Sequence, residues 1–267
     1  EQAVRKYSAA ATIFHNAGHI AHGRRDMADY DTHLELESLP TGGWGYDHFP
    51  MSAAYVRTIG KDFLGMTGKF HTTWGEFGGF KHPNALIYET GLSLACGAAI
   101  SIGDQMHPSG ELNESTYRLI GRAYELVERK EPYCEGAKNL ADIAVLSCEA
   151  VLGGGRESAG ADSNVGACRI LLEGKHLFDF VDEQADFARY KLLILPDKIR
   201  LSEALARRLR AYVDEGGRLL LTGESGLNEE GTAFALDVGA DFAGMSEFKP
   251  DYLVPDFETV NGRTEYV

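Results

Sequence analysis

The chain has 267 residues, of which 44% are hydrophobic and 25% are charged, and its formal net charge at pH 7 is −14. This composition is ordinary for a globular protein and argues against disorder. The negative charge argues against nucleic acid and an anionic membrane as partners, because binding to a polyanion depends on Lys and Arg side chains. No stretch approaches the roughly 20 apolar residues that a membrane span needs.

The cysteines and the chain ends bear on location and completeness. No two of the four cysteines form a C-x-x-C pair, which argues against a zinc ribbon and a disulfide scaffold. We therefore expect a reducing cytoplasm and no cofactor. The missing initiator Met, a start without a signal-peptide pattern and the abrupt end at Tyr266 and Val267 predict a piece cut from a longer chain.

Residues 1–135 repeat one pattern about four times. Strands are predicted at residues 12–15, 33–37, 68–72 and 98–102, each followed by a loop rich in polar and aromatic residues. The clearest helix covers residues 115–130, with Ser115 as its N-cap. Strand, loop and helix in repetition are typical of a (β/α)8 TIM barrel, whose active site lies on the loops after the strands. Four units predict the C-terminal half of such a barrel.

Residues 138–245 predict a separate α/β domain. Aliphatic runs at residues 141–148, 178–181, 191–195 and 218–222 indicate buried parallel strands, and residues 202–215 indicate a helix with Ser202 as N-cap. The alternation predicts a doubly wound, Rossmann- or flavodoxin-like sheet, as in class I amidotransferases. VLGGGR at residues 151–156 matches no phosphate-binding motif. Residues 246–267 are expected to be a tail or the start of a further segment.

Three acidic residues lie where barrel strands deliver their loops, namely Glu37, Glu76 and Asp104. Sugar hydrolysis needs two carboxyl groups flanking the glycosidic bond, one protonated and one ionised. Glu37 and Glu76 are the catalytic candidates, and Asp104 is a candidate for substrate contact. Two structural alternatives stay open: Glu37 as a strand-end carboxylate satisfied by backbone N–H groups, and Asp104 as a partner of amides at the barrel rim.

Aromatic and histidine side chains accompany these acids. Flat aromatic faces suit the C–H face of a sugar ring, and histidines in the same loops can bond sugar hydroxyls or fasten a loop. The substrate-binding candidates are therefore Trp44, Tyr46, His48, His71, Trp74, Asp104 and His107. His15, His19 and His22 have the spacing of a metal face on a helix, but Gly18 lies among them and favours a loop. We therefore expect no metal site.

Two stretches of sequence resemble known families. HLELESLPTGGWGYDHFP, GKFHTTWGEFGG and GAAISIGDQMHPSG resemble barrel strands six to eight of a bacterial group labelled hypothetical glycosyl hydrolase 6, which includes α-L-fucosidase-like enzymes. The resemblance covers residues 1–135. ADIAVLSC through DKIRLSEALARRLRAYVDEGGRLLLTGESG is similar to the trimerisation domain of family 42 β-galactosidases.

The resemblance implies a retaining glycosidase whose parent acts on α-L-fucosides. The first group implies a nucleophile on the fourth barrel strand, before residue 1, so the fragment alone is expected to be inactive. Family 42 instead implies a nucleophile on strand seven, where this chain has Glu76, and the role of Glu76 stays open. The second domain implies a homo-oligomer, with a trimer favoured. The alternatives are a β-galactosidase-like hydrolase, a non-catalytic carbohydrate-binding or assembly protein, and an amidotransferase-like hydrolase centred on the second domain.

Overall fold

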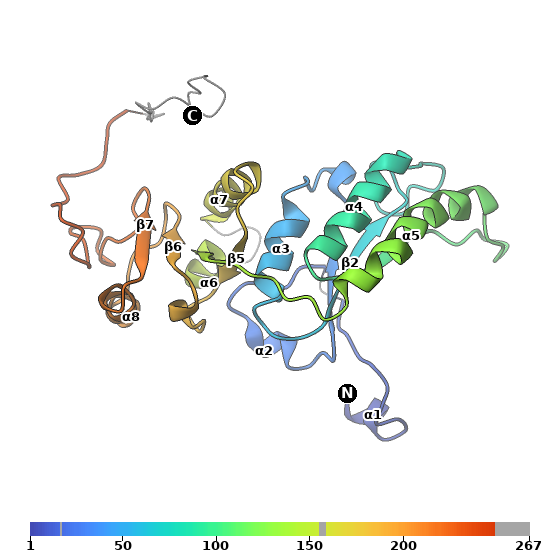
Figure 1. Cartoon of the computed structure of the whole chain (residues 1–267), viewed down its shortest axis with the longest axis horizontal. Helices are drawn as coiled ribbons and strands as arrows, with labels where there is room; N and C mark the ends of the chain where they lie inside the picture. The colour runs from blue at the N-terminus through green and yellow to red at the C-terminus, as the bar shows by residue number, and fades with distance from the viewer. Residues whose placement is uncertain (17, 155–158, 249–267) are drawn as a thin grey trace.

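The computed structural model describes residues 1–16, 18–154 and 159–248, which form two parallel sheets (Figure 1). One sheet has the strand order β1-β2-β3 and the other the order β5-β4-β6-β7. This mixed α/β architecture is consistent with a partial TIM-barrel-like fold. The predicted tail at residues 246–267 lies outside the described residues from residue 249 onward, as do the last two residues of VLGGGR.

The first sheet is built from strand, loop and helix in succession. Its strands are β1 (Leu34–Glu37), β2 (Phe63–Gly68) and β3 (Ala99–Gly103). The helices of this half are α1 (Gln2–Arg5), α2 (Arg25–Ala28), η1 (Pro40–Gly42), α3 (His48–Val56), α4 (Pro83–Ala95) and α5 (Glu114–Cys134). All strand pairs are parallel, so their carboxyl ends and the loops that follow them meet at one edge.

The second sheet is also built from parallel strands with helices between them. Its strands are β4 (Ile143–Leu146), β5 (Phe178–Val181), β6 (Leu192–Leu195) and β7 (Arg218–Leu221). Its helices are α6 (Cys148–Leu152), α7 (Ala161–Glu173), η3 (Phe187–Arg189) and α8 (Glu203–Asp214). The predicted cap of α8 is confirmed, because the Ser202 hydroxyl accepts a hydrogen bond from the Leu205 N–H at 3.2 Å.

Two predicted strands of the first half are wrong. Residues 12–15 form no regular strand, although Ile13 and Thr32 exchange hydrogen bonds beside β1. The strand predicted at residues 68–72 lies instead at Phe63–Gly68. Its glycines hid it, because glycine lowers the strand signal, yet a Cβ on Gly65 would lie 2.7 Å from the Phe49 ring. Close packing against α3 therefore requires glycine in this strand.

The predicted N-cap of α5 is also wrong by two residues. The helix begins at Glu114, and the Asn113 side chain accepts hydrogen bonds from the Ser115 and Thr116 N–H groups at 3.0 and 3.1 Å. Asn and Ser are equally good N-caps, and local sequence does not choose between neighbouring candidates.

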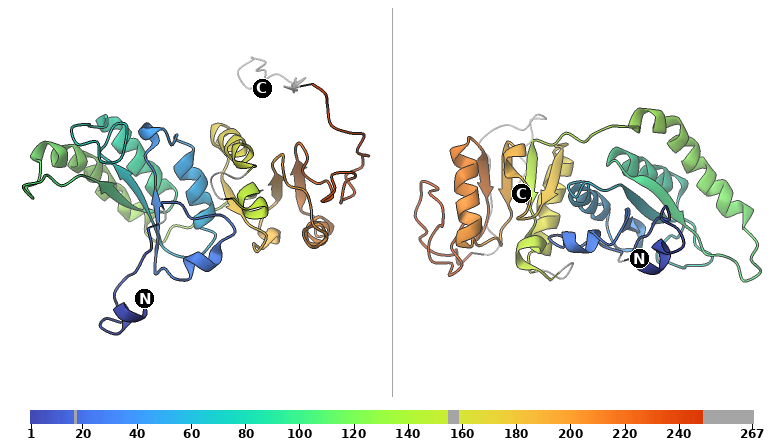
Figure 2. Two further views of the ribbon diagram at one scale, coloured as in Figure 1. Left: turned by 180° about the vertical axis from the view of Figure 1, so that it is seen from behind. Right: turned by 90° about the horizontal axis from the view of Figure 1, so that it is seen from below.

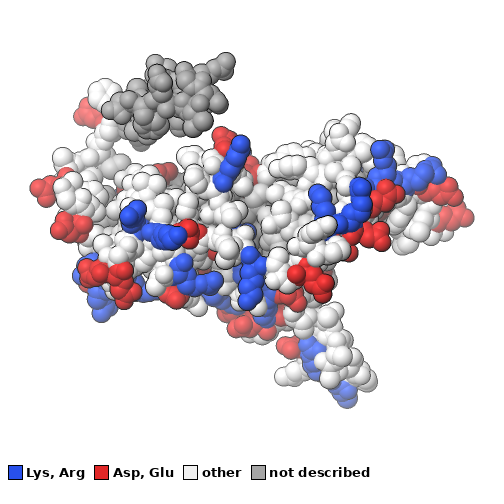
Figure 3. Space-filling model, in the orientation of Figure 1, with Lys and Arg blue, Asp and Glu red and all other residues white. Residues whose placement is uncertain are grey.

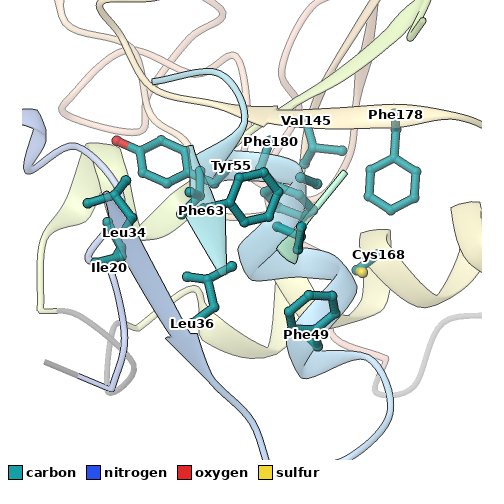
Figure 4. Packing of buried hydrophobic residues seen from close by; sticks show 14 of the residues in the cluster. Ile20, Leu34, Leu36, Phe49, Tyr55, Phe63, Val145, Cys168, Phe178 and Phe180 are labelled. Atoms are coloured by element: carbon teal, nitrogen blue, oxygen red, sulfur yellow. The ribbon is translucent and has the colours of Figure 1, made fainter. Parts of the chain in front are cut away.

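Helix α3 belongs to the cores of both sheets. It lies between them (Figures 1 and 2), packing on β1 from one side and on β5 from the other. A single apolar cluster includes Leu36 of β1, Tyr55 of α3 and Phe180 of β5 (Figure 4). Because Tyr55 and Phe180 are both fully buried, the two sheets share part of their hydrophobic stabilisation.

Polar bonds at the same interface are centred on Asp182, which directly follows β5. Its buried carboxylate accepts hydrogen bonds from Arg25 Nε at 2.6 Å, Arg25 Nη2 at 3.1 Å and the Tyr55 hydroxyl at 2.8 Å. Burial alone raises the pKa of the Asp182 carboxyl, but the bonds from Arg25 and Tyr55 outweigh it and hold the pKa below its ordinary value. The carboxylate is therefore ionised at neutral pH.

We predict that Asp182→Ala lowers the free energy of unfolding of the full-length protein by about 2–4 kcal/mol, because Arg25 and Tyr55 lose their acceptor. The control is Asp142→Ala, which removes an exposed pair with Lys191 and is expected to cost less than about 1 kcal/mol. Urea denaturation measures both. Since folding lowers the Asp182 pKa, its contribution is present at neutral pH and lost as the pH falls below about 3.9. Equal effects of the two substitutions would contradict this account.

Candidate active site

Strand β1 places Glu37 on the face of the sheet that lies away from the helices. Leu34 and Leu36 are fully buried in the core shared with α3, so the alternating residues Glu35 and Glu37 face the other side. The register aligns Glu37 with Met66 of β2, and Met66 with Ser101 of β3. In a (β/α)8 barrel this face is the interior, and its carboxyl end is where active sites lie.

In the described part of the chain, the Glu37 carboxylate lacks the bonds from backbone N–H groups that its structural alternative requires. None of the described residues forms a hydrogen bond or an ion pair with its side chain. A neighbouring loop approaches it, because a Cβ on Gly18 would lie 3.6 Å from Glu37 Oε2. Gly18 has a positive φ of 64°, so glycine suits this position for its backbone as well.

Glu76 lies in the loop after β2 and bonds to its own loop. Its Oε2 accepts hydrogen bonds from the Thr72 N–H at 2.8 Å and the Thr72 hydroxyl at 2.9 Å. These two bonds hold the pKa of Glu76 below its ordinary value. An ionised carboxylate suits a nucleophile or a charge stabiliser better than a proton donor. The same bonds also fix the shape of the loop.

Trp74 covers the ends of the two neighbouring strands. A Cβ on Gly68 or Gly103 would lie 3.0 or 2.6 Å from the indole Cζ3, so the ring rests on both glycines. Phe70 packs edge-on against it, with ring centroids 5.6 Å apart. The indole is therefore fixed across the carboxyl ends of β2 and β3, where a flat apolar surface can receive a sugar ring.

Two buried lysines, which the sequence analysis missed, hold this loop in place. The Lys69 ammonium donates to the carbonyls of Phe77 and Gly79 at 2.9 and 3.3 Å. The Lys81 ammonium bonds Glu89 of α4 at 2.6 Å. Burial lowers the pKa of Lys81, and the Glu89 charge opposes that shift. The only sequence signal was the pair of lysines that flank the aromatic loop.

The loop after β1 places its aromatic candidates differently. The buried His48 ring bonds the Ser38 hydroxyl through Nδ1 at 3.1 Å, a geometry that fastens the loop, and Trp44 packs edge-on against His48 at 5.0 Å. Tyr46 is 41% exposed and donates to Glu89 at 3.3 Å, and burial and that carboxylate raise the pKa of Tyr46 to about 12. Trp44 and His48 thus pack together, whereas Tyr46 contacts Glu89 of α4.

A small surface pocket lies beside Tyr46. Phe49 of α3, Gly65 and Thr67 of β2 and Glu89 of α4 line it. Gly65 packs on Phe49 of α3, so the pocket extends along the helix side of β2. Met66, which pairs with Glu37 in the sheet, also lines it.

The remaining candidates lie on exposed loops. Asp104 follows β3 directly and accepts a hydrogen bond from the Gln105 N–H at 2.7 Å. His107 bonds the Ser109 hydroxyl at 2.8 Å, and its ring lies 5.6 Å from that of Phe77. The loops after β2 and β3 are thus brought together, whereas His71 is exposed beside Glu76.

His19 and His22 join the first half to the second. His19 Nε2 lies 3.0 Å from Glu149 Oε1, and His22 Nδ1 lies 2.7 Å from the Ser147 hydroxyl. Complete burial lowers the pKa of His22 to about 4, so it is neutral at ordinary pH. The spacing of the histidines did not predict these contacts, because Ser147 and Glu149 lie more than a hundred residues away in the chain. Within the described ranges, no group of three His, Cys, Asp or Glu residues could hold a metal ion.

Charges are mixed over the visible face (Figure 3), where acidic and basic side chains alternate without a broad basic surface. In the part of the chain that the structure describes, no helix has both the length and the apolar character needed to cross a membrane.

We predict that Gly103→Ala displaces Trp74, because the new Cβ would lie 2.6 Å from its ring. The Trp74 signal is obtained as the difference in emission between the full-length protein and its Trp74→Phe variant, and in Gly103→Ala this signal is expected to shift to longer wavelength as the indole gains exposure. Gly121→Ala is the control, since nothing lies within 4 Å of its added Cβ. Emission that is unchanged in Gly103→Ala would contradict the packing described above.

The chain matches one family and several solved structures. The family described as the β-galactosidase trimerisation domain matches residues 170–249. The structure of α-L-fucosidase isoenzyme 2 from Paenibacillus thiaminolyticus is 51% identical with a TM-score of 0.91, and the match covers 100% of this chain and 41% of that one. No curated protein matches the chain.

Two β-galactosidases share the fold at low sequence identity. Gan42B, a GH42 enzyme from G. stearothermophilus, is 18% identical with a TM-score of 0.65, and the match covers 84% of this chain and 38% of that one. The enzyme from Bacillus circulans sp. alkalophilus is 16% identical with a TM-score of 0.65, covering 86% and 38%. The chain thus resembles glycoside hydrolases: along its whole length it is similar to part of an α-L-fucosidase, and it carries a segment that matches the β-galactosidase trimerisation domain.

Proposed function

We propose that the full-length protein is a retaining exo-glycosidase that acts on α-L-fucosides, and that residues 1–135 form the C-terminal half of its barrel. The observation that carries this proposal is the 51% identity to an α-L-fucosidase over the entire chain. The chain spans 41% of the length of that enzyme. Glu37 on the interior face of β1 supports the same assignment.

In this proposal Glu37 and Glu76 are the catalytic carboxyl candidates of the chain. The bonds from Thr72 lower the pKa of Glu76, and an ionised carboxylate suits attack on, or stabilisation of, the oxocarbenium-like carbon. Glu37 accepts no bond from any described residue, so its carboxyl is available to the substrate. Trp74 supplies a flat face for the sugar. The other binding candidates are Trp44, Tyr46, His48, His71, Asp104 and His107.

We further propose that residues 138–245 form a Rossmann- or flavodoxin-like unit that assembles the protein into a homo-oligomer, with a trimer favoured. The sheet order β5-β4-β6-β7 supports the fold assignment, since it places the first strand of the unit between its second and third. Exposed apolar side chains in the segment that matches the trimerisation domain support assembly, notably Ile170 and Leu177 at 65% and 63% exposure. Four free cysteines agree with a reducing cytoplasm.

Two alternatives concern the same barrel. A β-galactosidase-like hydrolase is favoured by the match of residues 170–249 and by the shared fold of the GH42 enzymes. A non-catalytic carbohydrate-binding or assembly protein would keep Trp44 and Trp74 and lack one carboxyl group of the pair.

The proposed function predicts that the full-length protein cleaves nitrophenyl α-L-fucoside faster than nitrophenyl β-D-galactoside. Glu76→Gln is expected to lower kcat by a factor on the order of 10³, because the charge that stabilises the transition state is lost. Glu37→Gln is the companion variant. If only one of the two is critical, its partner lies in sequence before residue 1. Cleavage of the galactoside alone would favour a β-galactosidase-like hydrolase. Nearly full turnover by Glu76→Gln would make Glu76 a structural residue.

For assembly, we predict that light scattering finds a trimer of the full-length protein at micromolar concentration. Stable interfaces bury on the order of 1,000 Å² or more. Ile170→Asp, which places a charge among the exposed apolar side chains, is expected to weaken the assembly, whereas Arg122→Asp on α5 of the barrel half is expected to leave it intact. A monomer at that concentration would contradict the assembly role.

A further inference from the structure

Glu149 of the second unit bonds directly to a loop of the barrel half. Glu149, on α6, accepts hydrogen bonds from His19 Nε2 at 3.0 Å and from the His22 backbone N–H at 3.1 Å. The side chains of Glu149 and His19 are only 7% and 12% exposed. Burial alone raises the pKa of Glu149, but the histidine contacts outweigh it and hold the pKa below its ordinary value. The buried carboxylate therefore stays charged and holds the loop by strong bonds.

Further contacts fix the same loop along its length. Ser147, just after β4, bonds the His22 ring, and Tyr55 accepts a hydrogen bond from the Gly23 N–H at 2.8 Å. Asp182, just after β5, binds the Arg25 side chain. Residues 147, 149 and 182 all follow the carboxyl ends of parallel strands, which is the edge where doubly wound sheets bind their ligands. In this protein the barrel's own loop occupies that edge.

The other end of the loop lies at the candidate active site. Gly18 approaches the Glu37 carboxylate, with 3.6 Å between its ideal Cβ position and Glu37 Oε2. The His19 ring lies 6.4 Å from the ring of His48, which in turn packs against Trp44. Between Gly18 and His19 there is one peptide bond. A displacement of His19 is therefore passed to the backbone beside Glu37.

We propose that Glu149 of the second unit is a positioning residue for the barrel site, holding residues 18–22 against Glu37. This inference rests on the proposed glycosidase function and assigns the second unit a part in turnover beyond assembly. Glu149 touches no candidate substrate group itself. It acts through His19 and His22, so its loss leaves Glu37 in place and disturbs the surface next to it.

The test compares three variants of the full-length protein on nitrophenyl α-L-fucoside, well below their melting temperatures. Glu149→Leu removes the acceptor, and Glu149→Gln keeps an oxygen for the His22 N–H but loses the charge facing His19. Asp179→Asn is the matched control, because Asp179 also crosses between the units, to Arg57 at 2.5 Å, but from the strand interior rather than its carboxyl end. Melting temperature, kcat and KM are measured for each.

We expect Glu149→Leu to lower kcat by roughly tenfold or more, the size of a lost bond to a charged group, with KM changed by less than about threefold. Glu149→Gln should fall between Glu149→Leu and wild type. Asp179→Asn should keep wild-type kcat despite a lower melting temperature. If kcat follows the melting temperature in all three variants, or stays at the wild-type value in Glu149→Leu, the proposal is wrong. If Glu149→Leu does not fold, wild-type kcat in Glu149→Gln overturns it equally.

The proposed substrate can fail separately. If the wild-type protein cleaves a different glycoside, the fucoside assignment is wrong, and the same three variants are compared on that glycoside. A wild-type protein that cleaves no glycoside contradicts both the function and the positioning role.

Discussion

Hydrogen bonds from one barrel loop to two buried carboxylates, Glu149 and Asp182, join the two halves of this protein. Each carboxylate lies just beyond a parallel strand of the second sheet, and each is kept ionised by its partners despite burial. A buried charge without such partners would cost several kcal/mol, so the loop and the sheet edge depend on each other. Helix α3 completes the junction, because its Tyr55 lies in the shared apolar core and donates to Asp182.

At this junction, residues of the first half lie against the carboxyl ends of β4 and β5. Residues 19, 22 and 25 of the first half bond to this edge, and Cys148 lies beside it at the start of α6. Cys148 is fully buried with its sulfur 3.1 Å from the Pro196 carbonyl, and burial raises its pKa to about 11. Burial and a raised pKa both lower the reactivity of a thiol, so Cys148 lacks the properties of a catalytic cysteine. The same edge instead supports the barrel loop beside Glu37.

The sequence was most informative where local pattern decides structure. The strands of the second unit are short aliphatic runs, such as Leu192–Leu195. The cap at Ser202 is a bond to a residue only three positions away. The position of β2 was predicted wrongly, because Gly65 is required there by tertiary packing that no local pattern reveals. Glu37 was placed correctly at the end of a strand, but the contact of His19 with Glu149 joins residues 130 positions apart. The spacing of the histidines fits a metal face and Gly18 favours a loop, but neither feature indicates a contact with Glu149.

The central claim is that the barrel loop and the second sheet form one cooperative structure. Native-state hydrogen exchange of the full-length protein tests it most directly, through the His22 and Gly23 amides, which donate to Glu149 and Tyr55. The account predicts that these two amides exchange as slowly as those of β4 and β5, because opening the loop requires the interface to open. Exchange at the rate of an exposed loop, with β4 and β5 still protected, would contradict it.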